Sequence, residues 1–133
     1  MAVRALICVL SLAAAAFLVV EERGARAAAD IQHSALASGA PKPGQTARAR
    51  AQLPTAERWN PDTDPRVDIG VLEVRAKHWR AAGAEFAAVT RREPENAQAW
   101  ALLGFAAARY DSGLAARALA RERALEPPVP RAR

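Results

Sequence analysis

The sequence predicts an all-α fold, and three observations lead to this prediction. Alanine, the residue with the highest helix propensity, accounts for 35 of the 133 residues. Val, Ile and Thr, which favour strands, number only 16 together. Pro61, Pro94 and Pro127 lie 33 residues apart, an even spacing that is typical of a solenoid of repeated units. We therefore expect an N-terminal transmembrane or signal-anchor helix followed by a short α-solenoid of helix–turn–helix repeats.

Residues 1–22 are expected to form a membrane anchor or a signal segment. Residues 5–20 carry no charge. As a helix they measure about 24 Å, or about 30 Å when counted from Met1, which matches the hydrocarbon core of a bilayer. The three alanines at 27–29, before Asp30, are a candidate signal-peptidase site. Four charged residues separate this site from the apolar run, so we favour a retained anchor over a cleaved signal.

The charges that flank the apolar run set the expected topology. Arg4 and the amino terminus precede the run, and Arg23 and Arg26 follow it, so the comparison of positive charges is nearly even. Because the short leader carries no acidic residue, the segment resembles a signal anchor. We therefore expect a single-pass membrane protein whose N-terminus lies in the cytoplasm and whose repeats lie on the extracytoplasmic side.

Residues 23–62 are expected to form a degenerate first repeat. Its first helix is expected over about 25–37, continuous with the apolar helix. Residues 38–44 contain two prolines and two glycines, which predicts a loop. Ala49 and Leu53 then occupy the positions that two apolar residues hold one repeat later, which places a second helix there.

Two complete units are expected to follow, over residues 63–96 and 97–130, and residues 131–133 form a tail. In the first unit, Asp64 followed by proline is a typical helix start. In the second unit, Asn96 can cap the first helix in the same way. A turn predicted at 111–113 separates the last two helices.

Several residues in these units recur with a fixed spacing. In the segment 96–104, Trp100, Leu103 and Gly104 stand at the fourth, seventh and eighth positions of the unit, and Gly70 lies 34 residues before Gly104. The preceding unit ends with Ala82, Phe86 and Pro94 at matching positions of a second helix. This pattern resembles the tetratricopeptide repeat family, as in a small membrane-anchored bacterial member. One departure is Arg66, which stands where the family has a large apolar residue.

The resemblance implies a concave groove lined by the first helix of each unit. Carried onto this chain, the groove positions include five candidate peptide-binding residues: Val71, Arg75, Gln98, Phe105 and Arg109. Arg75 and Arg109 occupy the same repeat position, so their guanidinium groups are expected to face one groove, where two arginines can hold a carboxylate. The alternative is that both are ordinary solvated arginines.

Composition argues against most other functions. The net charge of +5 is spread among 14 acidic residues and no basic run exceeds two, so we expect no nucleic-acid partner. A single cysteine excludes an intrachain disulfide and multi-cysteine metal sites. The two histidines, His33 and His78, are far apart, and His78 is expected in solvent at a turn. We therefore expect no catalytic residue, no cofactor and no metal, and we do not expect an enzyme.

An acidic pattern near the first complete unit resembles a calcium loop only superficially. Asp62, Asp64, Asp68 and Glu73 stand at its first, third, seventh and twelfth positions, but Val67 stands where that loop needs glycine. We therefore expect these acids to serve the helix start instead.

The expected function is that of a membrane-anchored, non-catalytic adaptor that binds a protein or peptide. Two and a half repeats are fewer than the three or so needed to bury a continuous core. An apolar edge should remain exposed, which favours a partner or self-association. The alternative is an extracytoplasmic or periplasmic accessory subunit of an envelope-assembly enzyme complex.

Overall fold

The computed structural model describes residues 2–59 and 64–126, and for residues 2–16 and 59 it describes the backbone only. These residues form six helices and no strand, so the all-α prediction is confirmed for the described part of the chain. In chain order the helices are α1 (Ala2–Leu36), α2 (Gln45–Trp59), α3 (Asp64–Arg75), α4 (Trp79–Arg92), α5 (Ala97–Ala107) and α6 (Ser112–Leu125).

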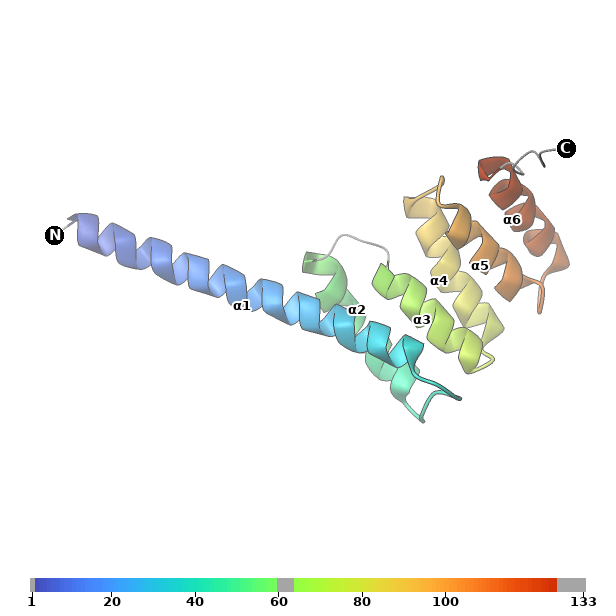
Figure 1. Ribbon diagram of the computed structural model, residues 1–133, viewed down its shortest axis with the longest axis horizontal. Helices are drawn as coiled ribbons and strands as arrows, with labels where there is room; N and C mark the ends of the chain where they lie inside the picture. Colours follow the sequence, from blue (N-terminus) through green and yellow to red (C-terminus); the bar gives the residue numbers. More distant parts are fainter. Residues whose placement is uncertain (1, 60–63, 127–133) are drawn as a thin grey trace, which may run out of the picture.

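Consecutive helices pair into three hairpins, α1–α2, α3–α4 and α5–α6, which stack into a helical repeat array (Figure 1). Helix α3 packs against both helices of the first hairpin, and α5 packs against α4. The connections inside the hairpins lie along one edge of this array, at the end remote from the N-terminus of α1 (Figure 1). Side chains from different hairpins can therefore meet at this edge.

Helix α1 projects far beyond its neighbours at its N-terminal end (Figure 1). Among its described side chains Ile31 is fully buried, and Phe17, Leu18 and Val19 lie about half exposed or more. Met1 and the side chains of residues 2–16, on which most of the predicted anchor falls, lie outside the description. Within the described residues, no helix combines the length and apolarity needed to cross a membrane.

Two apolar clusters form the core, and α3 contributes to both. The first cluster joins α1, α2 and α3: it contains Ala27, Ile31, Ala35, Ala49, Leu53, Ala56, Ile69 and Leu72. The second cluster joins α4, α5 and α6 around Phe86 and Leu103, and Val67 and Val74 of α3 pack against it. Because α3 is apolar on two sides, it needs a neighbour on each.

Two glycines explain the 34-residue spacing. A Cβ on Gly70 would lie 2.4 Å from Cε1 of Phe86, and a Cβ on Gly104 would lie 2.7 Å from Cδ2 of Leu119. In each case the first helix of a hairpin passes so close to the second that a methyl group does not fit without movement. The repeated glycine therefore marks the closest approach inside each hairpin.

The structure confirms one predicted helix cap and places one predicted turn elsewhere. The side chain of Asn96 accepts a hydrogen bond from the backbone N–H of Ala99 at 2.9 Å, which confirms it as a cap. The turn predicted at 111–113 lies at 108–111 instead: α5 ends at Ala107 and α6 already begins at Ser112, where Asp111 caps it by accepting from the N–H of Leu114 at 2.8 Å. Residues 60–63 and the tail 131–133 lie outside the described residues.

Candidate binding surface

Arg75, the first arginine of the predicted pair, is engaged with the backbone of the first hairpin. Its Nη1 donates to the carbonyl oxygens of Ser34 at 2.9 Å and Ala35 at 2.8 Å, and its Nε donates to that of Gly39 at 3.1 Å. The last carbonyls of a helix lack partners within the helix and carry partial negative charge. Arg75 thus caps α1 from the neighbouring hairpin and holds the loop that follows α1.

Arg109, the second arginine of the predicted pair, lies in a different place. Its guanidinium carbon is 5.2 Å from the centre of the Trp79 ring. Arg75 and Arg109 line two different pockets. In the structure the two arginines therefore have different partners and line different pockets, and their joint role in a peptide groove stays a prediction.

The other three predicted site residues also separate. Val71 is half-buried and packs against both apolar clusters, so it serves the core. Gln98 is exposed on the first turn of α5. Phe105 is 51% exposed, and its ring meets that of Trp79 edge to face, with the centres 6.1 Å apart and the planes at 72°. Phe105 and Arg109 share a neighbour, because both contact the ring of Trp79.

A crossed pair of cation–aromatic contacts joins the second and third hairpins. Trp79 and Arg80 begin α4, and Arg109 and Tyr110 stand in the connection between α5 and α6. Arg109 covers the Trp79 ring, and Arg80 covers the Tyr110 ring with its guanidinium carbon 5.2 Å from the ring centre. Each hairpin therefore supplies one ring and one cation to the other, and such contacts are worth about 0.5–1 kcal/mol at exposed sites.

A small residue makes room for this arrangement. A Cβ on Gly83 would lie 2.0 Å from the hydroxyl oxygen of Tyr110. The Tyr110 side chain can therefore reach across α4 only because residue 83 has no side chain. In sequence terms Gly83 is a weak point of a helix, yet α4 continues through it.

These residues line a pocket of about 620 Å³, which we call the cation–aromatic pocket: Lys77, His78, Trp79, Arg80, Arg109 and Tyr110. No acidic side chain stands among the described residues that line it. Asp111, next in the chain, uses its carboxylate to cap α6. A guanidinium that lies on an aromatic ring keeps the N–H groups at its edge free for a carboxylate. The pocket therefore offers positive charge beside aromatic surface.

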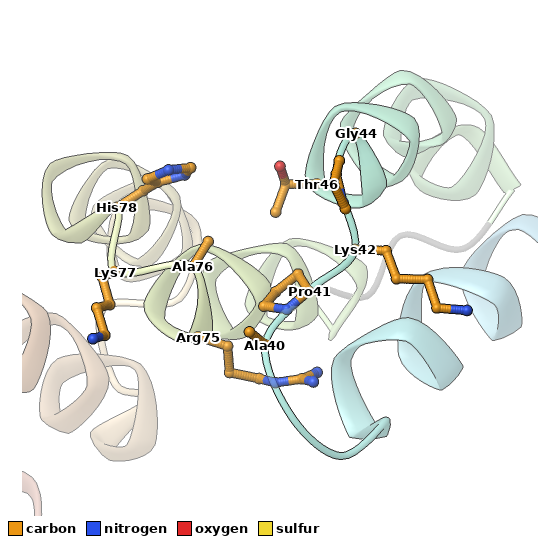
Figure 2. A pocket seen from close by; sticks show the side chains of 10 residues that line it. Ala40, Pro41, Lys42, Gly44, Thr46, Arg75, Ala76, Lys77 and His78 are labelled. Atoms are coloured by element: carbon orange, nitrogen blue, oxygen red, sulfur yellow. The ribbon is translucent and has the colours of Figure 1, made fainter.

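Figure 2 shows a second pocket, which has a volume of about 370 Å³. One wall comes from the loop after α1 and the start of α2, with Ala40, Pro41, Pro43 and Thr46, and the other from Ala76 and His78. We call it the proline-walled pocket. Figure 2 shows Thr46 and His78 on opposite sides, whereas Lys42 points toward α1. Lys77 and His78 line both pockets.

A chain of ion pairs that begins at His78 was not expected from the sequence. Buried Glu73 accepts from Nδ1 of His78 at 2.8 Å and lies 2.9 Å from Nη2 of Arg50. Arg50 also contacts Glu85 at 3.0 Å, and Glu85 lies 3.0 Å from Arg66. These carboxylates belong to α3 and α4 while Arg50 belongs to α2, so the pairs connect the first hairpin to the second.

The would-be calcium ligands do not converge. Glu73 is occupied by Arg50 and His78, whereas Asp64 and Asp68 lie on the first turns of α3. Asp62 lies outside the described residues. Among the side chains that the structure describes, those of residues 17–58 and 64–126, no group of three or more potential metal-binding residues is found.

No model of a protein family, no curated protein and no solved structure matches this chain. The resemblance to tetratricopeptide repeats therefore stays a prediction from the residue pattern.

Proposed function

We propose that this chain is a non-catalytic adaptor of the tetratricopeptide-like type, which binds an acidic segment of a partner protein in the cation–aromatic pocket. The observation that carries the proposal is the crossed pair of contacts that presents Arg80 and Arg109 on aromatic rings. Lys77 adds a third cation to the same pocket. In this proposal Arg80 and Arg109 form the carboxylate site, and Arg80 takes the place that the sequence analysis assigned to Arg75.

The chemistry of the pocket favours a peptide that alternates acidic and apolar residues. Carboxylates can form charge-assisted hydrogen bonds with the two guanidinium edges, each roughly twice as strong as a neutral hydrogen bond. Apolar side chains can pack on Phe105, half of whose surface is exposed. Because the stacked arginines are already oriented, little side-chain entropy remains to be lost on binding.

The test is a selection from a displayed library of random dodecapeptides on the immobilised full chain. We expect the enriched peptides to be rich in Asp and Glu. An enriched peptide is then labelled, and its affinity is measured by fluorescence anisotropy. The double variant Arg80→Glu/Arg109→Glu should weaken binding at least about tenfold, which corresponds to about 1.4 kcal/mol.

The matched control is Arg117→Glu/Arg121→Glu, which makes the same charge change on exposed positions of α6. Its affinity should stay close to that of the parent chain. Enrichment of neutral or basic peptides, or equal losses in both double variants, would contradict the proposal.

We further propose that the N-terminal half of α1 attaches the adaptor to a membrane as a retained anchor, with the repeats outside the cytoplasm. The support is the projection of α1 beyond its neighbours together with exposed Phe17, Leu18 and Val19 (Figure 1). In a flotation experiment with phospholipid vesicles, the full chain should float and a variant without residues 1–22 should not. N-terminal sequencing should find Met1 intact, and a mature chain beginning near Asp30 would contradict a retained anchor.

A further inference from the structure

We propose that the bound acidic segment continues from the cation–aromatic pocket across Lys77 and His78 into the proline-walled pocket, where it places an apolar residue. This inference rests on the proposed function, because it extends the same site. Its starting observation is that Lys77 and His78 line both pockets. The two pockets are therefore the two sides of one ridge, formed by the connection between α3 and α4.

The ridge presents side chains rather than backbone donors. The N–H of Lys77 donates to the carbonyl of Val74 at 2.9 Å, and that of His78 donates to the carbonyl of Glu73 at 2.8 Å. Lys77 adopts a left-handed backbone conformation with φ of 62°, and its side chain is exposed. A segment that crosses the ridge therefore meets the ammonium group of Lys77 and the imidazole ring of His78.

His78 has one ring nitrogen left for a ligand. Its Nδ1 lies 2.8 Å from a carboxylate oxygen of Glu73, which also pairs with Arg50. An ionised carboxylate only accepts hydrogen bonds, so Nδ1 carries the proton of this contact. The side chain of His78 is 62% exposed, so Nε2 is the ring nitrogen left to contact the bound segment. His78 lines both pockets.

The proline-walled pocket is built to stay open. Arg75 ties the loop after α1 to the end of α3 through the carbonyls of Ser34, Ala35 and Gly39. Pro41 and Pro43 restrict the backbone of the same loop. A preformed pocket costs less ordering on binding. Besides alanine, proline, glycine and Thr46, four basic residues line this pocket: Lys42, Arg75, Lys77 and His78. Lys42 points toward α1 and the guanidinium of Arg75 is engaged with the carbonyls (Figure 2), so the space between the prolines and Thr46 suits a small apolar residue.

The experiment blocks the second pocket and shortens the peptide in parallel. The probe is the enriched dodecapeptide, together with versions truncated from either end, and the protein is the full chain. Thr46→Trp should fill the proline-walled pocket and weaken the dodecapeptide about tenfold. The same variant should bind the truncated peptide that has lost its apolar end as tightly as the parent chain does.

Two further variants keep the result interpretable. Thr55→Trp makes the same substitution at an exposed position of α2 and should leave binding unchanged. Ala40→Trp fills the pocket from the loop, where it disturbs no helix, and should reproduce the effect of Thr46→Trp. Each variant is first checked for an unchanged helical circular dichroism spectrum.

The outcomes separate this inference from the proposed function. If the dodecapeptide binds, depends on Arg80 and Arg109, and ignores both Thr46→Trp and Ala40→Trp, the site ends at the first pocket and this inference is wrong. If binding does not depend on Arg80 and Arg109, the proposed function itself is wrong. Thr46→Trp should not weaken binding of the truncated peptide, because that peptide lacks the apolar residue that would enter the pocket. If it does weaken this binding, the substitution acts on another part of the site and the inference is wrong.

Discussion

Arg66 shows how one residue can depart from a repeat pattern while the helix pairs stay intact. The tetratricopeptide pattern has a large apolar side chain at this position, but Arg66 places its guanidinium 2.8 Å from Glu57 and 3.0 Å from Glu85. Glu85 is largely buried, so without a cation its ionised carboxylate would be strongly destabilising. Arg66, which departs from the repeat pattern, therefore provides the cation that buried Glu85 needs.

Residues whose role is local were predictable from the sequence, whereas residues with distant partners were not. Asn96 acts on a backbone N–H three residues away, and Gly104 repeats Gly70 at a fixed spacing. By contrast, Glu85 pairs with Arg50, which lies 35 residues earlier in the chain. No periodicity links such a pair, so only the packing of α2 against its neighbours reveals it.

Asp68 is expected to make stability depend on pH in the direction opposite to most acids. Burial, and then the nearby charge of Asp64, raise the pKa of Asp68 above its ordinary value. The folded chain therefore holds this proton more tightly than the unfolded chain, and the stability that it contributes increases as the pH falls through the raised pKa. At neutral pH the ionised group is unfavourable, so Asp68→Asn should raise the free energy of unfolding.

This prediction is checked by urea unfolding at pH 7 and again at a pH below the ordinary aspartate pKa of about 3.9. The advantage of Asp68→Asn should be larger at pH 7 than at the lower pH. Asp30→Asn, on an exposed position of α1, controls for the loss of one negative charge. If the stability advantage of Asp68→Asn instead increases as the pH falls, the predicted direction of the pH dependence is wrong.

At the scale of helices, the end of α1 is stabilised by a residue that belongs to α3. The carbonyl groups of Ser34 and Ala35 are among the last of α1, and both accept from Arg75. A cation at a helix C-terminus is favourable because of the partial negative charge there. The composition of the following loop predicted where this helix ends. The arginine that caps the helix could not be predicted in this way, because it lies 40 residues after Ala35 in the chain.

Arg75 and Arg109, which the repeat pattern treats as equivalent, should therefore behave differently. Arg75→Gln removes a charged donor from several carbonyls, and we expect the free energy of unfolding to fall by about 1–3 kcal/mol. Arg109→Gln removes one exposed cation–aromatic contact and should cost at most about 1 kcal/mol. The affinity for the dodecapeptide should fall more in Arg109→Gln than in Arg75→Gln.

Urea unfolding and fluorescence anisotropy on the same two variants measure these effects. Hydrogen exchange adds a local reading, since amides of the loop at 37–44 should exchange faster in Arg75→Gln only. Equal effects of the two substitutions on stability and on binding would support the equivalence implied by the repeat pattern and contradict the structure.

At the scale of the molecule, α3 joins two cores that do not otherwise merge. Ile69 and Leu72 complete the first cluster, and Val67 and Val74 pack against the second. Ion pairs from Arg50 to Glu73 and Glu85 cover the same junction. The order of the helices followed from turn signals in the sequence. The sequence did not indicate that the two complete units depend on the degenerate first hairpin, because that hairpin has the weakest repeat pattern.

The two complete units are therefore expected not to fold on their own. A variant restricted to residues 64–126 exposes Ile69 and Leu72, whose side chains are fully buried in the full chain. Each exposure costs about 1.5–3 kcal/mol, and Glu73 loses its contact with Arg50. The two exposures together, about 3–6 kcal/mol, are comparable to the lower part of the range for the entire stability of a small domain, about 5–15 kcal/mol.

Circular dichroism during urea unfolding tests this expectation. The shortened variant should lose its cooperative transition, whereas a variant that lacks only residues 1–16 should unfold with the same free energy as the full chain, because it retains Ala27, Ile31 and Ala35, through which α1 joins the first cluster. A cooperative transition with an unchanged midpoint for residues 64–126 would mean that the second and third hairpins form a complete core. In that case the first hairpin would act only as a support for the proline-walled pocket and for the projecting part of α1.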